Sequence, residues 1–233
     1  MQKINDFFDC VYYINLDSRE DRKDKFWSLN KEFLDEEKTV RIPAIDARNT
    51  TNCHDYYGIM KARTGISLSY LKPFRDAAKN KYNKILIFED DAQPLFSNLS
   101  QFEKSIKDAE QNDYSIIFFG GSVQSKLLPH DDSLFKISGN ILATQAVAYN
   151  NLSQGIFEEF LSFEDSFEWM IKFLISHGSV CMDTIIGEGM TKKYTTFLSN
   201  PLLFGQYSGH SDINAQEESY NSEMLERFEK FKC

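Results

Sequence analysis

The sequence contains no apolar run that approaches the length of a membrane span. Among its 233 residues, the longest apolar runs are residues 84–88 and 115–119, far short of the roughly 18 residues that a spanning helix needs. The first fifteen residues also lack the basic start and the apolar stretch of a secretory signal. These absences predict a cytoplasmic protein without a transmembrane segment.

Cysteine and proline are both scarce. The four cysteines, at positions 10, 53, 181 and 233, form no Cys-x-x-Cys pair, which argues against a zinc site and favours reduced thiols over disulfides. The five prolines are scattered, and no linker, internal repeat or low-complexity tract divides the chain. Because a chain of this length can bury one substantial core, we expect one domain over residues 1–233.

Basic residues are too few for a nucleic-acid-binding surface. The 26 Lys and Arg residues stand against 35 Asp and Glu residues, which gives a formal net charge of -9. Affinity for a nucleic-acid polymer depends on a continuous basic face that releases counterions, so that class of partner is excluded. A small anionic ligand is compatible with this charge if a metal ion or a few placed cations neutralise it locally.

Short strands and helices alternate in the first half of the chain. Strand-forming residues occupy 11–16, 39–42, 85–88 and 115–119, and helices are expected after Asp17-Ser18 and over 67–79 and 99–110. Such alternation predicts an α/β fold with a mostly parallel sheet flanked by helices. The strands that are apolar throughout should be buried on both faces.

The pattern becomes mixed after Gly121. Residues 134–138 and 141–149 flank Gly139-Asn140, an arrangement typical of a β-hairpin. Helices are expected at 153–161 and 166–175, and an amphipathic helix at about 218–233.

Three adjacent carboxylates, Glu89-Asp90-Asp91, directly follow the apolar strand at 85–88. Ligands of open α/β sheets bind at this carboxyl end of the strands. Adjacent carboxylates repel one another unless a cation compensates them, and Mg²⁺ and Mn²⁺ prefer oxygen ligands. In an extended backbone Glu89 and Asp91 would point to one side and Asp90 to the other. The sequence therefore indicates a divalent metal site, with a solvated acidic turn as an equally weighted alternative.

A set of motifs recurs in order along most of the chain: Tyr12-Tyr13-Ile14-Asn15-Leu16-Asp17-x-Arg19-x-Asp21-Arg22, Ala44-x-Asp46-Ala47, Ser69, Ile85-Leu86-Ile87-Phe88-Glu89-Asp90-Asp91-Ala92, Asp113-x-x-Ile116-x-x-x-Gly120, residues 144–149, Met182-Asp183, and Pro201-Leu202-Leu203 followed by Ser211-Asp212. In these motifs and their spacing the sequence resembles glycosyltransferase family 25, which includes lipooligosaccharide glycosyltransferases and collagen hydroxylysine galactosyltransferases.

The resemblance implies a GT-A-like, Rossmann-type fold and an inverting transfer of a sugar, commonly galactose, from a UDP-sugar. It implies a nucleotide-binding half at about 1–121, a mixed acceptor and catalytic half at about 122–217, and a C-terminal helix. The expected acceptor is a glycan, as in lipopolysaccharide biosynthesis, or a hydroxylated protein. The resemblance also implies donor contacts by Asn15, Leu16, Ser69 and Asp90.

Chemistry suggests further roles for charged residues in these motifs. A Mn²⁺ or Mg²⁺ ion on Glu89 and Asp91 would bridge the donor diphosphate and take up charge as the nucleotide leaves. Arg19 and Arg22 suit phosphate binding, although they also fit a solvated helix face. Asp46 is expected to contact the base or ribose of the donor; its alternative role is to stabilise a loop turn. His210 is expected to contact the donor; its alternative is a side chain exposed to solvent.

An inverting transfer needs a carboxylate base that takes the proton of the acceptor hydroxyl. Asp183 is the candidate, because it occupies the acidic position of the family motif. Its alternative role is to cap a helix that starts at Thr184. Asp165, Glu168 and Glu188 are the other candidates for the base.

One position departs from the family pattern: Ser69-Tyr70 stands where many relatives have Ser-His. This change leaves open a second function, that of a non-catalytic nucleotide-sugar or glycan-binding module. A metal-dependent phosphohydrolase is a third hypothesis, which the sequence does not favour because it contains neither a D-x-D-x-[TV] motif nor a P-loop.

Overall fold

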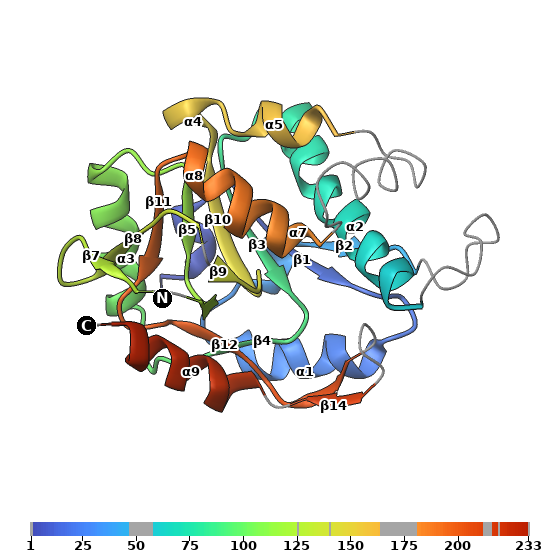
Figure 1. Cartoon of the computed structure of the whole chain (residues 1–233). Coiled ribbons are helices and arrows are strands. Elements are labelled where there is room, and N and C mark those ends of the chain that lie inside the picture. Colours follow the sequence, from blue (N-terminus) through green and yellow to red (C-terminus); the bar gives the residue numbers. More distant parts are fainter. Residues whose placement is uncertain are drawn as a thin grey trace.

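The chain forms an eight-stranded sheet with helices on both faces (Figure 1). The computed structural model describes residues 2–46, 58–124, 126–139, 141–163, 181–211, 216–218 and 220–232. The strand order is β2-β1-β3-β10-β5-β11-β8-β7. In this order the bounds are Thr39–Pro43, Cys10–Asn15, Lys84–Glu89, Ala146–Asn150, Ile116–Phe118, Thr196–Ser199, Leu134–Ile137 and Leu128–Pro129.

Most strands of the sheet point in one direction. Strand β1 pairs in parallel with β2 and β3, and β5 pairs in parallel with β11. Strands β10 and β8 are antiparallel to all of their neighbours. The structure confirms the predicted α/β class, with a mainly parallel sheet and a mixed second half.

The predicted hairpin at 134–149 is wrong. Strand β8 pairs with β11 and β7, whereas β10 lies between β3 and β5 in the centre of the sheet. The residues of β10, from Ala146 to Asn150, are all buried. Strand β10 is therefore covered on both faces, and this burial outweighs the local turn signal of Gly139-Asn140.

Two hydrophobic clusters cover the two faces of the sheet. Side chains of α1 and α3 belong to one cluster, and side chains of α2, α5, α7 and α9 belong to the other. A stretch of π-helix, η4, continues from α7. The helices span Glu20–Asn30 (α1), Gly58–Asn80 (α2), Ser100–Gln111 (α3), Asn151–Gln154 (α4), Phe157–Leu161 (α5), Met182–Thr184 (α7), Ile185–Met190 (η4), Thr191–Lys193 (α8) and Tyr220–Phe231 (α9). Short 3-10 helices occur at Ile4–Phe7 (η1) and Glu36–Lys38 (η2).

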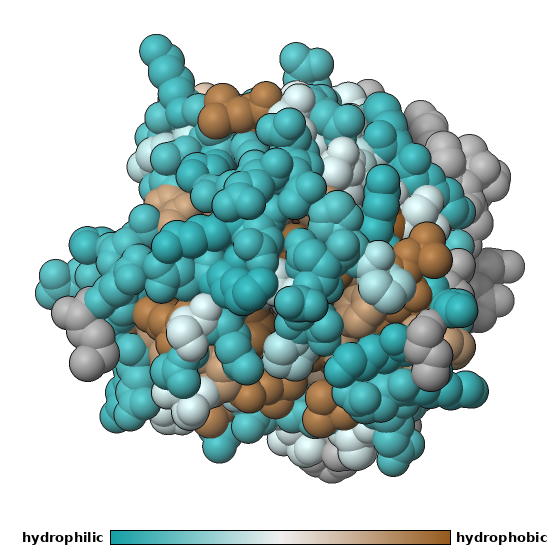
Figure 2. Space-filling model, turned by 90° about the vertical axis from the view of Figure 1, so that its left-hand side faces the viewer, coloured by the Kyte–Doolittle hydropathy of each residue, from teal (hydrophilic) through white to brown (hydrophobic). Residues whose placement is uncertain are grey.

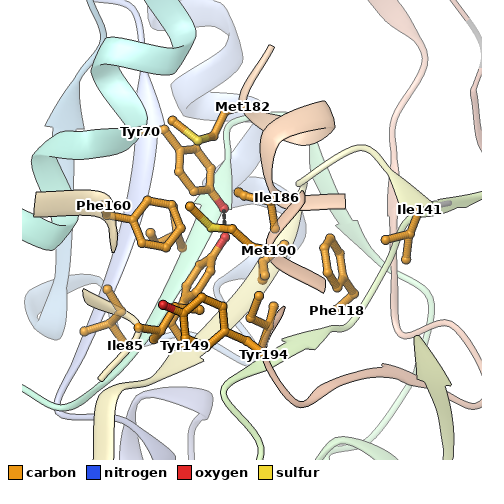
Figure 3. Packing of buried hydrophobic residues seen from close by; sticks show 14 of the residues in the cluster. Tyr70, Ile85, Phe118, Ile141, Tyr149, Phe160, Met182, Ile186, Met190 and Tyr194 are labelled. Atoms are coloured by element: carbon orange, nitrogen blue, oxygen red, sulfur yellow. Dashed lines mark hydrogen bonds between the residues drawn. The ribbon is translucent and has the colours of Figure 1, made fainter. Parts of the chain in front are cut away.

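Aromatic side chains fill the cluster beneath α2. The hydroxyls of Tyr70 and Tyr149 lie 3.1 Å apart within hydrogen-bond distance (Figure 3). The rings of Phe74 and Phe160 stack with a centroid distance of 3.6 Å and an interplanar angle of 7°. These contacts join α2 and α5 to the centre of the sheet.

Several predicted helices differ in extent from the structure. Helix α2 begins at Gly58, well before residue 67. The helix expected at 153–161 is interrupted at Gly155, whose φ of 64° ends α4 before α5 begins. The helix expected at 166–175 and most of the loop at 48–58 lie outside the described residues. Helix α9 confirms the predicted C-terminal helix. Its side chains Met224 and Phe228 are buried in the hydrophobic cluster that also contains side chains of α2.

Three small antiparallel ladders accompany the main sheet. They pair β4 (Ala92–Pro94) with β12 (Phe204–Gln206), β6 (Ser122–Val123) with β9 (Ile141–Leu142), and β13 (Gly209–Ser211) with β14 (Gln216–Glu218).

The surface that Figure 2 shows is mainly hydrophilic, with separate hydrophobic areas. Strand β7 forms one edge of the main sheet, and both of its residues, Leu128 and Pro129, are exposed. Pro129 has no backbone N–H, so it weakens this edge as a template for pairing with another strand. Within the described part of the chain, no helix combines the length and apolar character needed to cross a bilayer.

Candidate active site

A cavity of about 860 Å³ opens at the carboxyl ends of β1 and β3. Asn15, the last residue of β1, and Glu89, the last residue of β3, both line it. Residues of α1, α2, α7, α9 and the segment after β12 form its other walls. Both its size and its place in the fold are typical of ligand sites in open α/β sheets.

The three acidic residues lie together at this end of β3. Glu89 ends the strand and accepts a hydrogen bond from the Thr144 hydroxyl. Asp90 and Asp91 form the turn between β3 and β4. The predicted separation of Asp90 from Asp91 does not occur, because side chains alternate only while the backbone is extended, and the strand has already ended.

Arg22 joins Asp90 and Asp91. Its guanidinium NH2 lies 2.5 Å from Asp90 Oδ1 and 2.9 Å from Asp91 Oδ2. Asn15 Nδ2 donates to Asp90 Oδ2 at 2.7 Å, and Arg41 Nε donates to the Asn15 carbonyl oxygen Oδ1 at 3.1 Å. This network fixes the turn after β3 against the carboxyl end of β1 and the first turns of α1.

Burial at the site disfavours the ionised forms of two of the three acidic residues. Burial raises the pKa of Glu89 to about 8, and the nearby charge of Asp91 adds to the rise. Burial also raises the pKa of Asp90 to about 6, although Arg22 opposes this shift. The ionised carboxylates are therefore destabilised in the free protein, and a bound cation would relieve them.

Asp183 faces the same cavity from the first turn of α7. Its charge contributes to the raised pKa of Glu89, which shows that the two carboxylates are near each other. The Thr184 backbone N–H donates to Asp183 Oδ1 at 2.7 Å, so Asp183 also stabilises the start of the helix. Within the described residues, no hydrogen bond or ion pair engages its other oxygen, Oδ2.

The structure describes one of the other candidates for the base. Glu188 is exposed on η4 and does not line the cavity. Asp165 and Glu168 lie outside the described residues.

Tight packing holds the helix of Asp183 against β9. A Cβ atom at Gly187 of η4 would lie 1.7 Å from the carbonyl oxygen of Ile141, so only glycine permits this approach. The chain then continues from β9 through Ala143, whose φ of 66° is unusual for a residue other than glycine. Both Ala143 and Thr144 line the cavity, and the Thr144 hydroxyl donates a hydrogen bond to Glu89. The packing of η4 against β9 therefore links the helix that carries Asp183 to the residue that contacts Glu89.

Most of the predicted donor-binding residues lie at the cavity. Leu16, Arg19, Arg22 and Asp46 line it, together with Asn15 and Asp90. Arg19 forms an ion pair with Asp21 at 2.9 Å. The wall formed by α1 and α2 also carries two cations that the sequence analysis did not single out, Lys25 and Arg63.

Ser69 does not contact the cavity, which corrects its predicted role as a donor ligand. Its side chain is completely buried in α2. The hydroxyl accepts a hydrogen bond from the Ile45 backbone N–H at 2.7 Å and donates to the Gly65 carbonyl oxygen at 2.6 Å. Ser69 therefore positions the loop of Asp46 from behind. Tyr70 is likewise buried away from the cavity, where it pairs with Tyr149.

His210 lies on strand β13, next to the cavity residue Gly209. Its side chain is outside the described part of the structure, so its predicted donor contact stays a prediction.

The donor set suits a divalent cation that is shared with a ligand. Among the described residues, no group of three or more His, Cys, Asp or Glu side chains could hold a metal by itself. Mg²⁺, however, is commonly bound by one or two carboxylates together with substrate phosphates. Glu89 and Asp91 offer two such carboxylates, and Asp91 Oδ1 is buried without a hydrogen-bond partner. These residues fit a cation whose remaining ligands come from a bound phosphate.

The cavity lining includes other residues that the sequence analysis did not single out. Among them, Thr144 follows Ala143 at the end of the β9 segment, Tyr207 follows β12, and Arg227 belongs to α9. Thr144 opens one of the recognised motifs, and Tyr207 lies between the motif that starts at Pro201 and Ser211-Asp212, so both had a signal in the sequence. Arg227 had none, because a single arginine on an amphipathic helix does not indicate which surface that helix covers.

No family model matches the sequence, and no curated protein matches it. Similar solved structures include three proteins. Mannose-1-phosphate geranyltransferase from Thermus thermophilus is 9% identical, with a TM-score of 0.46, over 82% of this chain and 72% of the other. A glycosyltransferase involved in the glycosylation of the major capsid of PBCV-1 is 10% identical, with a TM-score of 0.45, over 88% and 96%. UDP-glucose pyrophosphorylase complexed with UDP-glucose is 9% identical, with a TM-score of 0.44, over 95% and 80%. At such identities and TM-scores the similarities assign neither an activity nor a substrate to this chain.

Proposed function

We propose that this protein is a metal-dependent, inverting glycosyltransferase that transfers a hexose, galactose or glucose, from a UDP-sugar to a hydroxyl group. The observation that carries the proposal is a single cavity in which Glu89, Asp91 and Asp183 lie together, beside the cationic wall of α1 and α2. The ordered motifs that resemble glycosyltransferase family 25 support the same reaction. On this proposal the acceptor is a glycan or a hydroxylysine-like group.

The metal in this proposal is Mn²⁺ or Mg²⁺, held by Glu89 and Asp91. Such an ion acts as a Lewis acid that neutralises charge on the diphosphate as it leaves. The residues of the chain have complementary tasks. Arg19 and Arg22 orient the phosphates, because a guanidinium matches phosphate geometry, and Asp46 accepts a hydrogen bond from the base or ribose.

Asp183 is proposed as the general base. Inversion requires that the acceptor oxygen attack the sugar from the face opposite the departing nucleotide, while a carboxylate removes the proton of that oxygen. Asp183 has an oxygen that faces no other described partner, and it comes from α7 rather than from the acidic turn. The base and the metal ligands therefore come from different elements of the fold.

The test combines binding and transfer. A panel of UDP-sugars is titrated into the protein with and without Mn²⁺, and an acceptor screen follows with the donor that binds. Asp91→Asn should abolish Mn²⁺-dependent binding and transfer, whereas Asp183→Asn should retain donor binding and lose transfer by roughly 10²–10⁴-fold. Asp24→Asn, at an exposed position of α1 outside the cavity, is the matched control. Full transfer activity in Asp91→Asn would refute the metal assignment.

A second function has one specific observation in its favour. Arg22 forms an ion pair with Asp91 at 2.9 Å, so this carboxylate has a cationic partner within the chain, as a non-catalytic nucleotide-sugar or glycan-binding module would require. This alternative predicts donor binding that does not depend on Mn²⁺ and gives no turnover. Metal-dependent transfer with any acceptor would exclude it.

A further inference from the structure

At one place in the cavity, three buried polar atoms have no hydrogen-bond partner among the residues that the structure describes. They are Arg22 Nε, Asp91 Oδ1 and the hydroxyl oxygen of Tyr207. A buried polar group without a partner costs about 1–3 kcal/mol, so such groups are rare unless a ligand, an ion or water satisfies them. Arg22 pairs with Asp91 through other atoms, and the Tyr207 hydroxyl lies close enough to the Arg22 side chain for the two groups to interact. The three atoms therefore lie together in one cluster.

The backbone places Tyr207 directly beside Asp91. Strand β12 pairs antiparallel with β4, with Gln206 opposite Ala92. The ladder continues by one more hydrogen bond, in which the Tyr207 N–H donates to the Asp91 carbonyl oxygen at 3.0 Å. The position of Tyr207 is thus tied to the acidic turn through the main chain.

Helix α9 fixes the same strand from its other side. The Gln206 backbone N–H donates to Asn221 Oδ1 at 2.7 Å. Gly205 permits this approach, because a Cβ atom there would lie 2.1 Å from the same Asn221 oxygen. Tyr207 is therefore held in place before any ligand arrives, and its hydroxyl is available without a rearrangement of the strand.

The chemistry of the three atoms is complementary to one kind of ligand. The phenol of Tyr207 carries an O–H group that can donate a hydrogen bond. Arg22 Nε is also a donor, and the two donors suit an anionic oxygen. Asp91 Oδ1 is an acceptor or a cation ligand. A diphosphate that carries a divalent cation would satisfy all three atoms together.

We infer, on the basis of the proposed function, that Tyr207 is a donor-binding residue whose hydroxyl acts with Arg22 Nε to bind a phosphate oxygen of the metal-bound diphosphate. On this inference Asp91 would hold the cation, for which its Oδ1 atom is available. Because Tyr207 contacts the diphosphate, its contribution is the same whichever sugar the donor carries.

The test is Tyr207→Phe, which removes the hydroxyl and keeps the ring. Calorimetric titration measures the affinity for UDP and for inorganic pyrophosphate, each with Mn²⁺. We expect both affinities to fall roughly 10- to 100-fold, the range for a hydrogen bond to a charged group. The melting temperature of the free protein should stay equal or rise, because the hydroxyl that is lost has no partner.

Tyr114→Phe is the matched control. Like Tyr207, Tyr114 has a buried hydroxyl without a hydrogen-bond partner among the described residues, but Tyr114 is fully buried and does not line the cavity. This variant should show the same change in melting temperature and no change in affinity.

Several outcomes would overturn the inference. Unchanged pyrophosphate affinity in Tyr207→Phe would show that water, not phosphate, satisfies the hydroxyl. A lower melting temperature would show that the hydroxyl is already paired in the free protein. If the wild type does not bind pyrophosphate in the presence of Mn²⁺, the inference is also refuted. If pyrophosphate binding depends on Tyr207 but no UDP-sugar binds, the phosphate site stands and the proposed function fails.

Discussion

Gly187→Ala tests the packing that positions Asp183. The added Cβ would lie 1.7 Å from the carbonyl oxygen and 2.9 Å from the carbonyl carbon of Ile141. To restore van der Waals contact, η4 and β9 must separate by roughly 1–2 Å. The obstacle is backbone rather than a flexible side chain, so no rotamer change can relieve it.

The expected loss of stability follows from this geometry. Overpacking a core costs about 1–3 kcal/mol, and we expect the upper end of that range, partly offset by the roughly 1 kcal/mol that alanine gains over glycine in a helix. Gly189, two residues along the same π-helix, has nothing within 4 Å of the position that an added Cβ would take. Gly189→Ala should therefore be neutral or stabilising by up to about 1 kcal/mol. The free energies of unfolding of the two variants should differ by roughly 2–3 kcal/mol.

Urea denaturation followed by circular dichroism measures this difference, and Mn²⁺ titration in the presence of UDP measures its effect on the site. Because β9 leads into Thr144, displacement of β9 should weaken this Mn²⁺ binding in Gly187→Ala and leave it unchanged in Gly189→Ala. If Gly187→Ala is as stable as Gly189→Ala, the contact with Ile141 is not as close as the structure shows. If it is less stable but binds Mn²⁺ normally, β9 does not position Thr144.

Two further predictions concern the buried polar groups. Folding raises the pKa of Glu89 from 4.5 to about 8 and that of Asp90 from 3.8 to about 6. Between the lower and the higher value the unfolded chain has lost a proton that the folded protein keeps, so the free energy of unfolding should fall by about 1.4 kcal/mol per pH unit for each such group and level off above about pH 8. Denaturation between pH 5 and 9 checks this; Glu89→Gln should flatten the fall, and a wild-type stability that rises with pH would contradict it. Ser69→Ala should cost about 1–3 kcal/mol, because it leaves the Ile45 N–H without its acceptor. Ser28→Ala, at an exposed hydroxyl, is the control, and equal stabilities would disprove the role of Ser69.

The location of the site could be predicted from the sequence because it depends on local features. The apolar runs that end at Asn15 and Glu89 mark two parallel strands, and the carboxyl ends of parallel strands meet at one edge of the sheet. Charged residues shortly after these strands, such as Arg22 in the first turn of α1 and Asp91 in the turn after β3, therefore come together.

The remaining features depend on pairings between distant segments. Tyr207 reaches Asp91 only because β12 pairs with β4, and no local pattern specifies that register. The central position of β10 was missed for the same reason, since its apolar residues fit either a hairpin or an interior strand. Ser69 shows a different limit: a buried serine hydroxyl bonds to the backbone as readily as to a ligand, and the sequence does not distinguish the two.

The position of β11 has a consequence for how the chain folds. Strand β11, at residues 196–199, lies between β5 and β8, so β8 and β7 cannot join the main sheet until β11 has been synthesised. During translation, residues 128–137 therefore leave the ribosome long before their partner strand. Pairings between segments so far apart in sequence raise the contact order and slow folding. We therefore expect the last third of the chain to limit the folding rate, and nascent chains that stop before β11 to depend on chaperones.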